Sequence, residues 1–140
     1  MPNAERGTAR LAALVETLVA AIPEATTVYL YGSEAAGEAS ASSDLDLAVV
    51  AAEAIAPRRI AEAREVLAET ARRDVDLIDL ARVPTVMQAQ VVSRGTILRD
   101  ADPAHRERFE TRVYSAYARL NEERREILER IQREGRIHGR

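Results

Sequence analysis

The sequence contains no cysteine and no lysine among its 140 residues. The absence of cysteine excludes disulfide scaffolds, thiolate zinc sites and cysteine nucleophiles. Because all 20 basic residues are arginines, lysine-based chemistry such as a phosphate-binding P-loop lysine is also excluded. Histidine is scarce as well: only His105 and His138 are present, which disfavours a multi-histidine metal site.

Long hydrophobic runs are absent too. No apolar run approaches the roughly 20 residues that a membrane helix needs, and the first residues lack the charged and apolar regions of a signal peptide. The composition, 46% hydrophobic and 31% charged, is that of one globular domain with a single core. The net charge of −3 disfavours broad nucleic-acid binding. We therefore expect a soluble, cytoplasmic protein without a membrane or nucleic-acid partner.

Hydrophobic periodicity predicts an alternation of helices and strands. Helices are predicted at residues 8–22, 57–73, 84–93 and 103–132, and strands at residues 26–31, 45–50, 75–80 and 96–98. Pro57 and Pro84 stand at helix starts, and Gly95 is expected as the C′ residue after a helix. Residues 34–43 are small and polar, which predicts a loop or a short turn of helix. The fold class is therefore α/β, with a small mixed β-sheet flanked by helices.

The last 40 residues form a separate unit in this interpretation. Residues 1–100 are predicted as the core and residues 101–140 as a C-terminal helical extension. The long helix carries an apolar stripe, but its distal half has little to pack against within one small domain. We expect the half up to about Leu120 to lie across the sheet. The distal half is expected to stand out as an arm that binds another chain, in a homo- or hetero-oligomer.

Two carboxylates stand at the start of the second strand. Asp44 and Asp46 are two residues apart, so they share one face, with Cα atoms about 6.5–7 Å apart. Such a pair repels itself unless a cation is present, and carboxylate oxygens suit a divalent cation. Asp76, on the third strand, comes alongside if the two strands are neighbours. Three carboxylates would then hold two metal ions about 3.5–4 Å apart, as in nucleotidyl transfer.

A glycine and a serine follow the first strand. Gly32 lets the backbone approach a phosphate closely, and the Ser33 hydroxyl and the following N–H groups are suitable donors. Ten residues separate Ser33 from Asp44, enough to return the chain to the neighbouring strand. Ser43 is either a turn residue or a phosphate contact. An isolated Asp-x-Asp pair would more simply be a cap or a solvated strand end, but its combination with this turn and Asp76 favours a metal site.

These residues resemble the Gly-Ser-x10-Asp-x-Asp pattern of the DNA polymerase β-like nucleotidyltransferase superfamily. The resemblance is to its minimal nucleotidyltransferase (MNT) branch, in which an x-Ala-x-Gly stretch and a Ser-Asp-x-Asp-Leu segment are typical. Here residues 32–37 are GSEAAG, residues 43–47 are SDLDL, and the third carboxylate falls in the VDL of residues 75–77. The resemblance covers about residues 10–100 and implies the polymerase β-like nucleotidyltransferase fold, with the long C-terminal helix as an addition.

The resemblance also implies a mechanism. ATP would bind with its triphosphate on the Gly32-Ser33 turn, with Ser43 as a further nucleotide-binding residue. Mg²⁺ would be held by the three catalytic carboxylates, and the third of them would take the proton of the attacking hydroxyl. The attack on the α-phosphorus would be in line, with pyrophosphate leaving.

Many MNT proteins are antitoxins paired with a HEPN-domain ribonuclease toxin, and some transfer AMP to a toxin tyrosine. The resemblance therefore implies a HEPN-domain toxin as partner and acceptor. One departure supports an alternative function: family members often carry arginine in the x-Ala-x-Gly stretch, where this chain has Glu34 and Ala36. The alternative is a catalytically weak antitoxin that neutralises its partner by binding alone.

Overall fold

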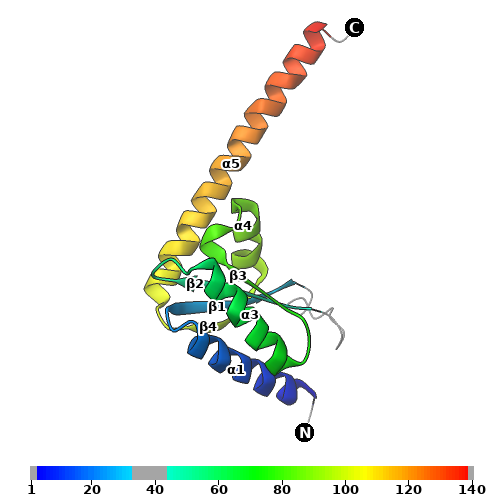
Figure 1. Cartoon of the computed structure of the whole chain (residues 1–140). Helices are drawn as coiled ribbons and strands as arrows, with labels where there is room; N and C mark the ends of the chain where they lie inside the picture. Colours follow the sequence, from blue (N-terminus) through cyan, green and yellow to red (C-terminus); the bar gives the residue numbers. More distant parts are fainter. Residues whose placement is uncertain (1–2, 33–43, 139–140) are drawn as a thin grey trace.

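The computed structural model describes residues 3–32 and 44–138 of the chain (Figure 1). In chain order, the elements within these ranges are α1 (Asn3–Ala21), β1 (Ala25–Tyr31), β2 (Leu45–Ala51), α3 (Pro57–Ala71), β3 (Val75–Asp79), the short 3-10 helix η1 (Leu80–Arg82), α4 (Thr85–Arg94), β4 (Thr96–Asp100) and α5 (Pro103–His138). The predicted alternation of helices and strands is confirmed. The loop or short helical turn predicted at residues 34–43 lies outside the described residues.

The strands form one mixed sheet in the order β3-β2-β1-β4. β1 is antiparallel to both of its neighbours, β2 and β4, whereas β2 and β3 are parallel. The C-terminal end of β1 therefore meets the N-terminal ends of the other three strands at one end of the sheet. Gly32 directly follows β1, so we call this the Gly32 end. The predicted small mixed sheet is confirmed.

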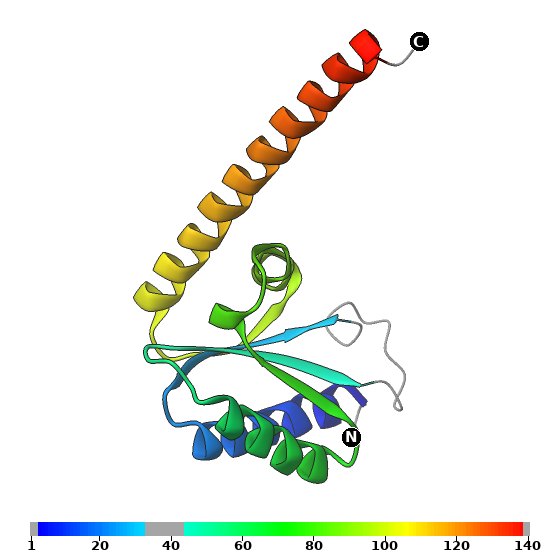
Figure 2. The same ribbon diagram turned by 45° about the horizontal axis from the view of Figure 1, so that its top comes forward.

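Helices cover both faces of the sheet (Figure 2). Helices α1 and α3 pack on one face, where the first core contains Leu47 and Leu77 among its buried strand residues. Helix α4 and the first part of α5 pack on the other face, where the second core contains Ala48 and Val50. Successive side chains of a strand point to opposite faces, so the apolar run in β2 supplies both cores.

Helix α5 extends well beyond the body of the molecule (Figure 1). Phe109 and Val113, in its first half, are buried in the second core. Residues 121–135 are exposed throughout, so the distal half of the helix stands clear of the body. The helix reaches His138, six residues beyond the predicted end at 132. Within the described ranges, no helix combines the length and the hydrophobicity needed to cross a membrane.

Several element ends differ from the predicted ranges by one to six residues. The third strand stops at Asp79 rather than residue 80, because the Asp79 side chain accepts a hydrogen bond from the backbone N–H of Ala81 and starts η1. Gly95 ends α4 as predicted, but its φ is −72°, so the position does not require a left-handed residue. It requires the absence of a side chain: a Cβ there would lie 2.5 Å from the Val91 carbonyl oxygen and 3.2 Å from that of Leu30.

Candidate active site

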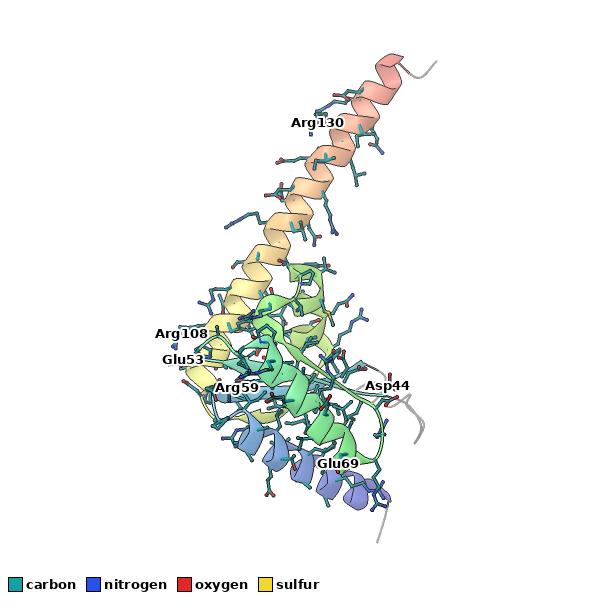
Figure 3. The ribbon with its side chains drawn as sticks, viewed as in Figure 1. Asp44, Glu53, Arg59, Glu69, Arg108 and Arg130 are labelled. Carbon is teal, nitrogen blue, oxygen red and sulfur yellow. The ribbon has the colours of Figure 1, made fainter. Side chains whose placement is uncertain are left out.

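The three predicted aspartates lie at the Gly32 end of the sheet, on two neighbouring strands. Asp46 is the second residue of β2 and Asp76 is the second residue of β3, and these two are Cα partners in the parallel register. Asp44 is exposed and lies immediately before β2, at the Gly32 end of the sheet (Figure 3). The predicted neighbourhood of Asp46 and Asp76 is therefore confirmed.

Asp46 and Asp76 belong to the sheet face on which α4 and α5 pack. Leu47 and Leu77, which follow them, point into the first core on the opposite face, and side chains alternate along a strand. Tyr31 of β1 is the register partner of Asp46 and packs against the second core. Three side chains from three adjacent strands thus form one polar row across the sheet.

The carboxylates of this row influence one another. Partial burial raises the pKa of Asp46 above its ordinary value, and the charges of Asp76 and Asp44 raise it further. Neighbouring negative charges disfavour the ionised form of a carboxyl group, and a bound cation would reverse that effect. A set of carboxylate oxygens is also the donor set that hard divalent cations such as Mg²⁺ prefer. The residues present therefore fit such a metal in their chemistry.

The Asp76 carboxylate already has two partners. The Tyr31 hydroxyl donates a long hydrogen bond of 3.4 Å to its Oδ2 atom, and Arg64 Nη2 lies 3.7 Å from its Oδ1 atom. Among the described residues, no three His, Cys, Asp or Glu side chains are arranged so that they could hold a metal ion as they stand. The metal site of Asp44, Asp46 and Asp76 therefore stays a prediction.

Neither Tyr31 nor Arg64 is predicted from the sequence as a site residue. Burial raises the pKa of Tyr31, and the charges of Asp76 and Asp46 raise it further, so the hydroxyl keeps its proton and acts as a donor. Arg64 is held in place from α3 by a 2.9 Å hydrogen bond that it donates to the Leu77 carbonyl. The alternation of β1 could have indicated Tyr31, but nothing in the sequence distinguishes Arg64 from other surface arginines.

Gly32 lies in close contact with the polar row. Its φ is +74°, a left-handed conformation that side chains with a Cβ rarely adopt. A Cβ at this position would collide with Asp46 Oδ2. The glycine predicted to admit a phosphate is therefore also required by its neighbour in β2. Ser33 and Ser43, the other two predicted nucleotide-binding residues, lie outside the described residues, and so do Glu34 and Ala36.

Comparisons with known proteins place this arrangement in context. Residues 14–104 match the family described as polymerase beta, nucleotidyltransferase. The chain is 34% identical over 110 residues to the protein adenylyltransferase MntA of Shewanella oneidensis, covering 79% of this chain and 78% of MntA. The match to the family spans every strand and all four residues of the polar row and its turn, Tyr31, Gly32, Asp46 and Asp76.

Solved structures of toxin–antitoxin complexes contain chains with a similar fold. A crystal structure of a toxin–antitoxin with AMP-PNP contains a chain that matches with a TM-score of 0.75 and 32% identity, over 86% of this chain and 98% of that one. A structure of tri-AMPylated Shewanella oneidensis HEPN toxin in complex with MNT antitoxin matches with a TM-score of 0.72 and 30% identity, over 88% and 96%. The chain described here belongs to the polymerase β nucleotidyltransferase family.

Proposed function

We propose that this chain is a Mg²⁺-dependent protein adenylyltransferase that transfers AMP from ATP to a hydroxyl of a HEPN-domain toxin, and that it acts as the antitoxin. The observation that carries this proposal is the register of Asp46 with Asp76, with Asp44 and Gly32 at the same end of the sheet. The likeness to MntA supports a protein as the acceptor of AMP. The proposed reaction is cytoplasmic, where ATP is available.

The proposed reaction is an in-line displacement at the α-phosphorus of ATP. The acceptor oxygen forms a bond to this phosphorus while the bond to the β-phosphate oxygen breaks, and pyrophosphate leaves with that electron pair. The proton of the acceptor hydroxyl passes to the Asp76 carboxylate. Tyr31 and Arg64 contact that carboxylate and hold it in position. Gly32 lets the backbone approach the phosphates closely.

Asp44, Asp46 and Asp76 would hold the Mg²⁺ in this proposal. Bound Mg²⁺ supplies positive charge to the phosphates and to the charge that develops during the displacement. The clustering of the carboxylates supports this role, because three negative side chains at the start of two adjacent strands repel one another without a cation.

We also propose that the distal half of α5, the arm of residues 121–135, binds the toxin. Its large apolar side chains are exposed: Ile127 by 45%, Leu128 by 61% and Ile131 by 56%. Ile127 is 18 positions after Phe109, which is about five turns of an α-helix, so both point to the same side. Phe109 faces the second core beside α4. A partner on this stripe would therefore lie on the side of the sheet that carries the polar row.

The test of AMP transfer uses the purified full chain with a HEPN-domain toxin as the candidate acceptor, ATP and Mg²⁺. Intact-mass spectrometry of the HEPN protein should show added AMP groups. Asp44→Asn and Asp46→Asn should each abolish the addition. Glu53→Gln is the matched control, because Glu53 is an exposed carboxylate at the other side of the body (Figure 3). AMP addition that survives Asp44→Asn combined with Asp46→Asn would refute the proposed mechanism.

A second candidate function is neutralisation by binding alone. The exposed arm favours it, because a docking antitoxin needs an interface but no chemistry. The two functions separate in a growth-rescue assay against the toxin. Docking predicts that the Asp44→Ala, Asp46→Ala double variant still rescues growth and that removal of the residues after Leu120 abolishes rescue. Loss of rescue in the double variant would instead favour the enzyme.

A further inference from the structure

A cleft of about 330 Å³ opens directly beside Gly32. It lies between the end of β1 and one face of α4. Its lining residues are Tyr31, Gly32, Met87, Gln90, Val91 and Arg94. The four residues from α4 are spaced i, i+3, i+4 and i+7, so one helix face forms a whole wall. None of these four α4 residues belongs to the sequence motifs or to the polar row.

Arg94 is the charged residue of this wall. It is exposed, in the last turn of α4, and within the described residues it makes no hydrogen bond or ion pair. Two other arginines of the body, in contrast, have carboxylate partners: Arg64 lies beside Asp76, and Arg106 binds Asp100 at 2.9 Å. The wall therefore places an uncompensated guanidinium at the cleft.

The end of α4 is held closely against β1. The Gly95 N–H donates a 2.7 Å hydrogen bond to the Val91 carbonyl, and the glycine leaves no room for a Cβ against Leu30. Arg94 directly precedes this contact. Its backbone therefore lies close to the end of β1, and its exposed side chain lines the cleft beside Gly32.

The order of groups across the sheet indicates which part of ATP would reach the cleft. Asp76 on β3, Asp46 on β2 and Gly32 after β1 follow one another in strand order, and the α4 cleft comes next. In an in-line displacement, the attacking and leaving oxygens lie on opposite sides of the phosphorus. An acceptor hydroxyl that gives its proton to Asp76 therefore directs the leaving pyrophosphate toward Gly32 and the cleft.

We propose that Arg94 binds the β- and γ-phosphates of ATP in this cleft, and that it stabilises the pyrophosphate as the bond to the α-phosphorus breaks. The proposal rests on the proposed AMP transfer. A guanidinium suits this task because its planar fork binds phosphate oxygens in pairs and always carries its charge. The electron pair of the broken bond stays on the pyrophosphate, next to the Arg94 charge.

The test compares ligands with and without the β- and γ-phosphates. ATP, AMP and inorganic pyrophosphate are each titrated, with Mg²⁺, into the full chain and into Arg94→Gln by calorimetry. We expect Arg94→Gln to weaken ATP and pyrophosphate binding by about tenfold or more, as for the loss of a charged hydrogen bond. AMP binding should stay within about twofold, and Arg94→Lys should restore part of the loss. The matched control is Arg108→Gln, an exposed arginine away from Asp44 (Figure 3).

The outcomes separate this proposal from the proposed function. Equal ATP binding by the wild-type chain and Arg94→Gln would overturn the role of Arg94 and leave the AMP transfer intact. An equal loss of AMP and ATP affinity would also overturn it, because a structural effect would not distinguish the two ligands. If the wild-type chain binds neither ATP nor pyrophosphate, both proposals fail together.

Discussion

At the scale of single residues, the site depends on how closely Gly32 and Asp46 approach each other. The left-handed backbone of Gly32 and the Asp46 carboxylate leave no space for a side chain between them. The same absence of a Cβ would let a phosphate approach the backbone. One residue type therefore serves both the packing of the site and the proposed nucleotide binding.

Gly32→Ala tests this dual requirement. We expect the free energy of unfolding to fall by about 1–2 kcal/mol, from the left-handed backbone alone, and AMP transfer to be lost because Asp46 must move. Gly7→Ala is the control: Gly7 lies inside α1 with open space around it, so alanine should stabilise by roughly 0.5–1 kcal/mol. Urea unfolding and the mass assay measure both effects. Unchanged AMP transfer in Gly32→Ala would contradict the prediction.

Tyr31→Phe tests whether the hydroxyl positions Asp76. The variant keeps the ring in the second core but removes the donor to Asp76 Oδ2. We expect the stability to change by less than about 1.5 kcal/mol. The kcat of AMP transfer should fall by about tenfold, because a less well positioned base is less effective, while the KM for ATP stays the same. A raised KM with an unchanged kcat would assign Tyr31 to nucleotide binding instead.

At the residue scale, the sequence predicts charge positions better than contacts. The sequence places Asp46 and Asp76 second in their strands, and alternation fixes their faces, but only the parallel pairing of β2 with β3 makes them neighbours. The partners of Asp76 cannot be predicted in the same way. Arg64 reaches Asp76 from a helix on the opposite face of the sheet, and only the packing of α3 against β3 brings the two together.

At the scale of elements, one ion pair joins the turn after α1 to α3. Arg59, in the first turn of α3, forms a two-pronged contact with Glu24, with one of its hydrogen bonds at 2.8 Å, and it also donates to the Ala21 carbonyl at the end of α1 at 3.4 Å. The Arg59 guanidinium lowers the pKa of Glu24 from 4.5 to about 2. Both side chains are about one-third exposed or less.

The lowered pKa predicts a pH dependence of stability. Glu24 takes up its proton more readily in the unfolded chain, so its contribution is complete above pH 4.5 and is lost as the pH falls toward about 2. We expect Glu24→Gln to lower the melting temperature at pH 7, and its difference from wild type to shrink below pH 4.5. Glu62→Gln, which removes an exposed partner of Arg58, should have almost no effect. A difference for Glu24→Gln that is independent of pH would contradict this prediction.

Element boundaries show where sequence patterns are sufficient. Proline starts and apolar periodicity correctly predict α3, α4 and every strand of the sheet. The reason for Gly95 is not predictable, because a close approach to Leu30 depends on how α4 packs on β1. The cleft beside α4 is unpredicted for the same reason: it exists only once the helix and the strand are in place.

At the scale of the whole molecule, α5 divides into two parts. Its first half completes the second core, and the apolar side chains of its distal half are exposed. The sequence predicts this division because the apolar stripe continues beyond the length that one small body can cover.

Two apolar-to-alanine substitutions on the same stripe of α5, one in each half of the helix, should therefore behave differently. Phe109→Ala removes a buried ring and should cost about 3–5 kcal/mol of stability. Ile127→Ala, five turns farther on, should change the stability by less than about 0.5 kcal/mol but weaken binding to the HEPN protein. Urea unfolding and calorimetric titration of the partner measure the two effects. Equal destabilisation by both variants would show that the arm packs on its own body in solution.

The match to the nucleotidyltransferase family ends at residue 104, and α5 begins at Pro103. If the proposed roles hold, chemistry and partner choice are encoded in separate stretches of sequence. Mutations in the arm would then accumulate without a cost to the core, and the arm could follow a changing toxin while the proposed catalytic centre stays constant. Exchanging the arms of two such proteins should exchange their partners, which makes the helix a natural place to engineer new toxin–antitoxin pairs.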